Sequence, residues 1–214
     1  MAKFVVAVDG PAGSGKSSVS KAVASRLGFS YLDTGAGYRA FALHAMRNPE
    51  LSVEQAIDGF DYEISLDPNL QFARLAGSDI TEGIRSHEVA ARVSEYARLP
   101  QVRKLQLDDA RKRIEGAEAD GIVVEGRDIT TAVAPDAQVR VLLTASEAVR
   151  LSRRAKDMTE DVGNLVNRDR SDSQVVDFLT PAAGVALLDT TELDFEQSVD
   201  ALIGLIREGG HVGR

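Results

Sequence analysis

Short apolar runs alternate with longer amphipathic stretches along the first part of the chain. The apolar run FVVAV at residues 4–8 precedes a helical pattern over about residues 15–27, and Gly28 is a suitable residue to cap that helix. The segment SYLD at residues 30–33 reads as a second short strand, and residues 36–46 place apolar side chains at helical spacing. This order of elements is typical of an α/β fold with a parallel sheet.

The alternation is interrupted and then resumes. Residues 60–79 alternate apolar and polar positions and contain the turn signals DPN and GS, which predicts small antiparallel strands. We therefore predict an inserted subdomain over about residues 60–95, after which Pro100 opens a long helix to about residue 114. The remaining predicted elements are strands at 122–125, 139–143 and 185–189, a charged helical stretch from about 146 to 172, and a closing amphipathic helix near 195–207.

Composition limits the kind of protein that this is. A chain of 214 residues with 43% apolar side chains can bury a real core, so residues 1–214 are predicted to form a single domain. The formal charge of −8 disfavours a broad surface for nucleic acid or an anionic membrane. There is no cysteine, which excludes disulfides and thiolate metal sites, and no apolar run has the length of a signal peptide or a membrane span. We expect a cytoplasmic protein.

The segment GPAGSGKSS at residues 10–18 fits the phosphate-binding pattern G-x-x-x-x-G-K-[ST] between a strand and a helix. Glycines let backbone N–H groups point at phosphate oxygens, Lys16 adds a positive charge, and the Ser17 hydroxyl can bind Mg²⁺. The predicted ATP-binding residues are Gly10, Pro11, Ala12, Gly13, Ser14, Gly15, Lys16, Ser17 and Ser18.

A second segment, LDTGAGYRA at residues 32–40, places two glycines in the first turn of a helix. Gly35 and Gly37 each cost roughly 1 kcal/mol there relative to alanine, and close approach of a ligand to the backbone would explain them. Arg39 could then reach an anion at the end of the strand. The alternative makes Thr34 an ordinary N-cap and Arg39 a solvent-exposed charge, and this stretch alone leaves both open.

A third segment, VVEGRDITT, delivers charged side chains at the carboxyl end of a buried strand, where open α/β sheets bind ligands. Glu125 resembles the acidic residue that P-loop enzymes use to hold Mg²⁺ through water. Arg127 and Asp128 follow directly. The alternative is a surface ion pair between Arg127 and Asp128 after an ordinary strand.

Arginines recur in the charged stretch near the C-terminus. Arg168 and Asp172 are four residues apart and would share a helix face. A solvated charged helix is the alternative to a phosphate-binding segment, and the nearby P-loop favours the latter. The arginines of this stretch are Arg150, Arg153, Arg154, Arg168 and Arg170.

Four segments together resemble the bacterial cytidylate kinase family, whose members move the γ-phosphate of ATP to CMP or dCMP. They are VDGPAGSGKSSVSKAVASRLGFSYLDTGAGYRA, IRSHEVAARVSEYARLPQVR, VVEGRDITTAVAPDA and RDRSD, in this order over most of the chain. The resemblance implies a P-loop nucleoside monophosphate kinase fold. Such a fold has a central parallel sheet flanked by helices, a small antiparallel acceptor-binding insert at about 60–95 and a helical lid at about 150–175.

The resemblance also implies roles for individual residues. Arg39 and Arg103 match arginines that hold the acceptor phosphate, with Thr34 where the family often has serine. Ser94 and Asp128 match the groups that read the cytosine, and Arg127 matches a phosphate-binding arginine. Arg168 matches a lid arginine and Asp172 an aspartate that contacts the ribose. Lys16, Arg127 and Arg168 are thus implied as catalytic, and Ser17 and Glu125 as the Mg²⁺ site. We expect a monomer, although no pattern in the sequence fixes the oligomeric state.

Several positions depart from the family's pattern. The lid between Arg154 and Arg168 is short, and Val175 stands where an arginine is expected. Thr130 replaces a usual glycine, and Gly37 replaces a bulky apolar residue. A regulatory GTPase would need [NT]-K-x-D and D-x-x-G motifs that are not convincingly placed here. A kinase for another small acceptor, such as shikimate or dephospho-coenzyme A, and a non-catalytic nucleotide-binding homologue remain as alternatives.

Overall fold

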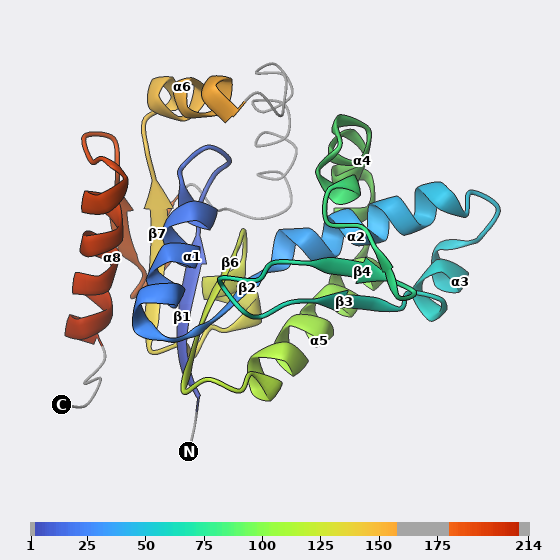
Figure 1. Ribbon diagram of the computed structural model, residues 1–214, viewed down its shortest axis with the longest axis horizontal. Coiled ribbons are helices and arrows are strands. Elements are labelled where there is room, and N and C mark those ends of the chain that lie inside the picture. Colours follow the sequence, from blue (N-terminus) through green and yellow to red (C-terminus); the bar gives the residue numbers. More distant parts are fainter. Residues whose placement is uncertain (1–2, 158–179, 210–214) are drawn as a thin grey trace.

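The computed structural model describes residues 3–157 and 180–209. Within these ranges, five parallel strands form a sheet in the order β2-β6-β1-β7-β8 (Figure 1). The predicted α/β architecture with a parallel sheet is confirmed. The strands are β1 (Phe4–Asp9), β2 (Ser30–Asp33), β6 (Gly121–Gly126), β7 (Val139–Thr144) and β8 (Ala186–Asp189).

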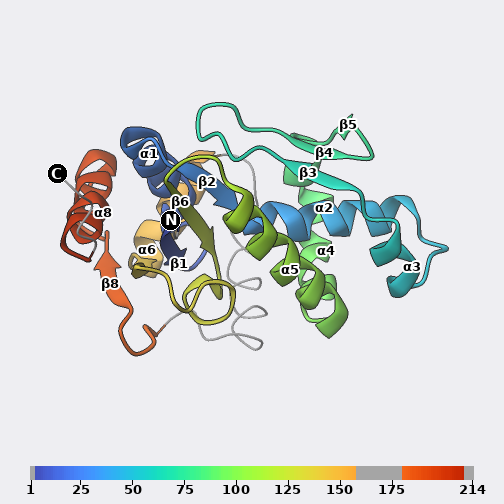
Figure 2. The ribbon, with the colours of Figure 1, turned by 90° about the horizontal axis from the view of Figure 1, so that it is seen from below.

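Both faces of this sheet are covered by helices, which explains why its strands are apolar runs rather than alternating sequences. In β1, Val5 and Ala7 pack on one side, while Val6 and Val8 pack on the other. Helices α2 (Thr34–Arg47) and α5 (Pro100–Gly116) contribute to the first core, and α1 (Lys16–Leu27) and α8 (Phe195–Gly209) to the second. Figure 2 shows the two helical layers on either side of the sheet.

The interrupted region forms a second, antiparallel sheet, as predicted. Its strands are β3 (Tyr62–Ile64), β4 (Ala73–Leu75) and β5 (Ser78–Asp79). Two flanking helices, α3 (Val53–Asp58) and α4 (His87–Ala97), were not predicted. The bounds 60–95 for an inserted subdomain stay a prediction.

Backbone and side-chain hydrogen bonds join the small sheet's β3–β4 connection to the main core. The Tyr31 N–H, on the edge strand β2, donates to the Leu66 carbonyl at 2.9 Å. The Ser25 hydroxyl, on α1, donates to the Asn69 side-chain oxygen at 2.8 Å. The second sheet is therefore anchored beside the phosphate-binding helix.

The charged stretch near the C-terminus is described only at its beginning. Helix α6 runs Glu147–Asp157, and the rest of the predicted lid, with Arg168, Arg170, Asp172 and Val175, lies outside the described residues. In the two described ranges, no helix has both the length and the apolar content to cross a membrane.

Candidate active site

The predicted P-loop is the turn between β1 and α1, and its backbone requires glycine. Gly10 has φ 156°, and a Cβ there would lie 2.1 Å from the Leu143 carbonyl oxygen on β7. Gly15 has φ 92° and caps the N-terminus of α1. These conformations are ones that other L-residues rarely adopt, so the loop stays tight and its N–H groups remain at the start of a helix.

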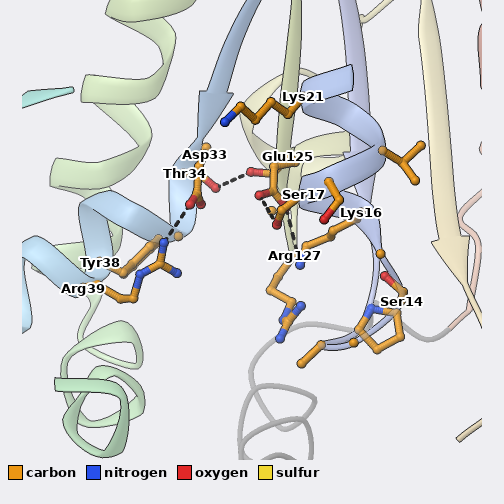
Figure 3. A pocket seen from close by; sticks show the side chains of 18 of the residues that line it. Ser14, Lys16, Ser17, Lys21, Asp33, Thr34, Tyr38, Arg39, Glu125 and Arg127 are labelled. Carbon is orange, nitrogen blue, oxygen red and sulfur yellow. Dashed lines mark hydrogen bonds and ion pairs between the residues drawn. The ribbon is translucent and has the colours of Figure 1, made fainter. Parts of the chain in front are cut away.

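A cluster of polar side chains lies where α1 meets the end of β6 (Figure 3). Glu125 is only 2% exposed, and its Oε1 accepts hydrogen bonds from Ser17 Oγ at 2.5 Å and Tyr31 Oη at 3.1 Å. Lys16 Nζ lies 3.4 Å from Glu125 Oε2. The buried carboxylate is thus held by a cation and two hydroxyl groups, which offsets the cost of its burial.

Burial governs the protonation of this cluster. It lowers the pKa of Lys16, and the Glu125 charge opposes that shift. Burial raises the pKa of Tyr31 well above its usual value, and Glu125 adds to the shift. Tyr31 therefore remains a neutral hydroxyl donor to the carboxylate.

The pair Ser17 and Glu125 fits a Mg²⁺ site. A hydroxyl and a carboxylate oxygen lie side by side at the start of α1, and Mg²⁺ is commonly bound by one or two protein oxygens together with substrate phosphates and water. Among the described residues, no group of three or more acidic or histidine side chains could hold a metal alone. A bound phosphate chain would have to complete the coordination.

The tip of β2 corrects part of the sequence interpretation. Asp33, not Thr34, caps α2, because its Oδ1 accepts from the Ala36 N–H at 3.1 Å. Thr34 Oγ1 instead donates to the Glu125 carbonyl at 2.8 Å. Arg39 is 18% exposed and donates to Asp33 Oδ2 at 2.7 Å, so the solvent-exposed alternative for it is wrong. Burial acts to raise the pKa of Asp33, but Arg39, Lys16 and the Ala36 N–H hold it below its usual value.

Close packing against Gln106 explains the glycine at position 37. The sequence suggested close approach of a ligand, but a Cβ at Gly37 would lie 2.2 Å from Gln106 Oε1 on α5. Gln106 Nε2 also donates to the Gly37 carbonyl at 3.3 Å. The absent side chain leaves room for a glutamine that ties α5 to α2.

Arg127 and Asp128 do not form the surface pair that was considered for them. Arg127 Nη1 donates to the Gly10 carbonyl at 2.5 Å, at the start of the P-loop. Asp128 Oδ2 accepts from Arg103 Nη2 at 2.6 Å. One of these neighbours thus turns toward the P-loop and the other toward α5.

A cavity of about 800 Å³ joins these groups. It extends from the P-loop, residues 11–18, along the ends of β2 and β6 to α4 and α5. Arg168 and Asp172 lie outside the described residues. The other predicted acceptor-side residues that line the cavity are Thr34, Arg39, Ser94, Arg103, Arg127 and Asp128.

Comparison with known proteins identifies the family to which this site belongs. Residues 6–208 match the sequence model of the family described as "Cytidylate kinase". The chain belongs to the cytidylate kinase family. The cytidylate kinase of Cutibacterium acnes is 43% identical over 215 residues, which cover 95% of this chain and 96% of that protein. That of Rhodococcus jostii is 41% identical over 99% of this chain and 98% of its own length.

This chain is therefore a nucleoside monophosphate kinase, and the predicted P-loop kinase fold is confirmed. A solved structure of a gluconokinase from Sinorhizobium meliloti is similar in fold, with a TM-score of 0.50, 17% identity and coverage of 97% of this chain and 94% of that one. The cytidylate kinase of Desulfitobacterium hafniense is 40% identical over 97% of this chain and 94% of its own length.

Two arginines of α6 donate hydrogen bonds to backbone carbonyls of this kinase's P-loop. Arg150 Nη1 donates to the Ala12 carbonyl at 2.9 Å. Arg153 Nη1 donates to the Ser14 carbonyl at 3.0 Å, and its Nη2 to the Thr190 carbonyl at 2.8 Å. The interpretation of this part of the charged stretch as a purely solvated helix is therefore wrong, because its arginines bind the backbone of the phosphate-binding loop.

Sequence reasoning missed several residues of the cavity. Lys21, on α1, and Tyr38, on α2, line it (Figure 3), and burial, followed by the nearby Asp128 charge, raises the pKa of Tyr38 to about 12. Lys21 lies on the helix that the P-loop opens, and Tyr38 directly precedes Arg39. Their closeness in sequence to the P-loop and to Arg39 could therefore have indicated that they lie near the site. Outside the cavity, Asp9 and Gln106 were also missed and gave no signal, because their partners are more than sixty residues away in sequence.

Proposed function

We propose that this kinase transfers the γ-phosphate of ATP to CMP, and also to dCMP, to give ADP and CDP or dCDP. The observation that best supports it is the single cavity of about 800 Å³ with the P-loop on one side and Arg39, Arg103 and Asp128 on the other. That volume is within the range of ligand sites. Phosphoryl transfer needs little more than two phosphates brought in line in a positively charged site.

The donor end is proposed to work through the P-loop. Its backbone N–H groups and Lys16 would hold the β- and γ-phosphates of ATP, and Ser17 with Glu125 would hold Mg²⁺. Bound Mg²⁺ would neutralise charge on the phosphate oxygens. The contact of Lys16 with Glu125, at 3.4 Å, keeps the ammonium group at the start of α1 before the substrate arrives.

The acceptor phosphate is proposed to bind near Thr34, Arg39 and Arg127. Arg39 is held by Asp33, and Arg127 by the Gly10 carbonyl, so both guanidinium groups are oriented in advance. A guanidinium carries five N–H donors in a planar fork whose geometry suits the oxygens of a phosphate. Preorganised positive charge of this kind stabilises an anionic transition state without reorganisation during the reaction.

The acceptor base is proposed to be read by Asp128 and Ser94. A carboxylate accepts from the exocyclic amino group of cytosine, whereas uracil presents a carbonyl oxygen there. Arg103, whose predicted partner is the acceptor phosphate, donates to Asp128 at 2.6 Å and so also fixes that carboxylate. Arg168 and Asp172 are proposed to add a lid arginine and a ribose contact.

A coupled assay of nucleoside diphosphate release tests this function. The full-length chain is incubated with Mg²⁺ and ATP or GTP, first without an acceptor and then with CMP, dCMP, UMP, AMP or shikimate. We expect little turnover without an acceptor and the highest kcat/KM with CMP or dCMP. Fast turnover without an acceptor, preference for another acceptor, or nucleotide binding without any turnover would each contradict the proposal and identify a different class.

A further inference from the structure

Asp9 is a buried carboxylate at the end of β1 for which the proposed reaction has no role. It is 3% exposed and directly precedes Gly10, the first residue of the P-loop. Its side chain turns toward the segment that follows Arg127 and Asp128. A buried charge in this position needs partners that repay its desolvation.

Those partners all belong to one short turn. Asp9 Oδ1 accepts from the Ile129 N–H at 2.8 Å, and Oδ2 accepts from the Thr130 N–H at 2.9 Å. Thr130 Oγ1 lies 2.6 Å from the same Oδ2 and supplies a third hydrogen bond. Ile129 and Thr130 are themselves buried, so water cannot replace the carboxylate. The side chain of Asp9 therefore fixes the backbone immediately after Asp128.

A second contact runs in the opposite direction. Gly10 directly follows Asp9, and its carbonyl accepts a hydrogen bond from Arg127 Nη1 at 2.5 Å. Residues 9 and 10, which lead into the P-loop, and residues 127–130, which carry the acceptor-side charges, are thus joined by side-chain contacts in both directions. Backbone fixed at both ends leaves the Arg127 and Asp128 side chains little freedom to shift.

We propose that Asp9, helped by the Thr130 hydroxyl, is a positioning residue that sets the place of Arg127 and Asp128 relative to the P-loop. It touches neither substrate. It acts through the N–H groups of Ile129 and Thr130, so its loss changes how well the acceptor is bound and read, and leaves donor binding largely intact. The inference rests on the proposed function in taking Arg127 and Asp128 to be acceptor-binding residues.

Asp9→Asn and Thr130→Val test the proposal by weakening the contacts of Asp9 to different extents. An asparagine has one acceptor oxygen, so either orientation of its amide leaves the Ile129 or the Thr130 N–H without an acceptor. Thr130→Val keeps the shape and removes only the hydroxyl, whereas Thr130→Ser keeps the hydroxyl. Ser52→Ala is the control, because the Ser52 hydroxyl also accepts a backbone N–H bond, from Gln55 at 3.2 Å, but at the start of α3, which does not line the cavity.

Steady-state kinetics are measured with ATP and with whichever monophosphate proves to be the best acceptor of the wild-type protein. For Asp9→Asn we expect KM for that acceptor to rise about tenfold and its preference over the next acceptor to fall about tenfold, since small misplacements of a binding group have effects of this size or larger. The KM for ATP should stay within about twofold. Thr130→Val should raise the acceptor KM and lower the acceptor preference by about threefold each, and Thr130→Ser should have the wild-type values of both.

The two hypotheses fail in different ways. If the best acceptor of the wild type is not CMP or dCMP, the proposed function is wrong, while the change in acceptor KM still decides the role of Asp9. If neither variant differs from Ser52→Ala in acceptor KM and preference, and only kcat or the amount of folded protein falls, Asp9 is merely structural. If Asp9→Asn does not fold, the comparison of Thr130→Val with Thr130→Ser decides. If no acceptor is turned over, calorimetric affinity for CMP in the same variants replaces KM.

Discussion

Lys16 holds its positive charge in a largely buried position. Burial lowers its pKa, and Glu125, 3.4 Å away, partly restores it. A triphosphate beside the same ammonium group would add negative charge and favour the charged form further. The residue is thus suited to bind phosphate more strongly than an exposed lysine would, because little water screens it.

Replacing this lysine should abolish turnover without unfolding the protein. Loss of a group that stabilises transferring phosphate oxygens costs about 2.7–4 kcal/mol in the barrier, so we expect Lys16→Ala to lose about 10²–10³-fold in kcat. Circular dichroism should show an unchanged fold. Lys104→Ala, at an exposed position on α5, is the control and should keep wild-type activity. Turnover of Lys16→Ala within a few-fold of wild type would contradict the assignment.

Asp128 should decide between cytosine and uracil. Uracil would leave this carboxylate facing a carbonyl oxygen, and an unpaired buried polar group costs about 1–3 kcal/mol, or roughly ten- to hundredfold in kcat/KM. We expect wild type to prefer CMP over UMP by that factor and Asp128→Ala to lose the preference. Asp108→Ala, in an exposed pair with Lys104, should not change it. Equal kcat/KM for CMP and UMP in the wild type would refute the role.

Residues whose function depends on neighbours in sequence were the ones that the sequence could predict. The P-loop is one continuous turn, and Arg127 and Asp128 follow a buried strand, so both were found from spacing. One of the two interpretations left open made Thr34 the cap of α2, but the cap is Asp33, one position earlier, and the Thr34 hydroxyl donates to the Glu125 carbonyl ninety-one residues away. Long-range contacts of this kind leave no pattern in a single sequence.

At the level of elements, the start of α2 combines a cap with an ion pair. Asp33 accepts from the Ala36 N–H and from Arg39, and its pKa lies below the usual value. An aspartate with a lowered folded-state pKa stabilises the fold above its unfolded-state pKa of about 3.9, and that contribution disappears as the pH falls through the folded-state value.

Asp33→Asn measures this contribution, because asparagine keeps the cap and removes the charge. At pH 7 we expect the variant to be less stable than wild type by about 1–3 kcal/mol, the range for hydrogen bonds to charged groups. Urea unfolding at a series of pH values should show the difference shrinking below about pH 4. A difference that stays constant down to pH 3 would show that the charge of Asp33 does not contribute.

Gly37 and Gln106 allow packing to be compared with helix propensity. Propensity alone predicts that Gly37→Ala stabilises α2 by up to about 1 kcal/mol. The 2.2 Å approach of Gln106 Oε1 predicts instead a loss of about 1–3 kcal/mol from overpacking. Gly204→Ala on α8, where a Cβ meets nothing within 4 Å, is the matched control and should be neutral or stabilising.

A double-mutant cycle tests this. Urea unfolding is measured for wild type, Gly37→Ala, Gln106→Ala and the variant that carries both substitutions, with Gly204→Ala as the control. We expect Gly37→Ala to cost less in the Gln106→Ala background, since the clash is then gone. Equal costs in both backgrounds would show that the glutamine is not what requires glycine at position 37.

The strands of the main sheet could be predicted from the sequence, whereas two helices could not. The strands of the main sheet are continuous apolar runs, and their predicted ends agree with the structure to within one or two residues. The helices α3 and α4 were missed, although Ser52 with Gln55 forms a capping box and Val89 with Val93 forms a buried stripe. A six-residue helix such as α3 is not stable alone and exists because α2 and α5 bury its apolar face, which a local pattern cannot reveal.

Across the whole molecule, the cavity depends on three parts of the chain that meet at the carboxyl end of the parallel sheet. The P-loop comes from the first third of the sequence, whereas the segment after β6 and the α4–α5 region both come from the middle third. The sequence predicted the P-loop, the strand before Arg127 and Asp128, and α5, but not α4, and the resemblance implied that these parts serve one reaction. The sequence did not predict the strand order that brings β6 beside β1, because that order follows from packing of both sheet faces.

The arginine expected at Val175 should have a substitute on α6 or in the stretch that follows. Arg150, which contacts the P-loop at Ala12, Arg154 and Arg170 are the candidates. We expect alanine at one of the three to lower kcat by about 10²-fold, as loss of a preorganised charge does, with a smaller effect on the affinity for CMP. If steady-state kinetics show no change above about threefold, or roughly 0.7 kcal/mol, at any of them, a weakened lid is the better interpretation.

The hydrogen bond from the Tyr31 N–H to the Leu66 carbonyl has a consequence for how copies of this protein behave at high concentration. β2 is an edge strand of four residues, and an open edge can pair with a strand of another copy and so start aggregation. The bond occupies a residue inside this short edge, and the connection from β3 lies against it. This bond interrupts the row of free N–H and C=O groups on β2, so the insert makes this edge of the sheet a poorer template for a strand of a second copy.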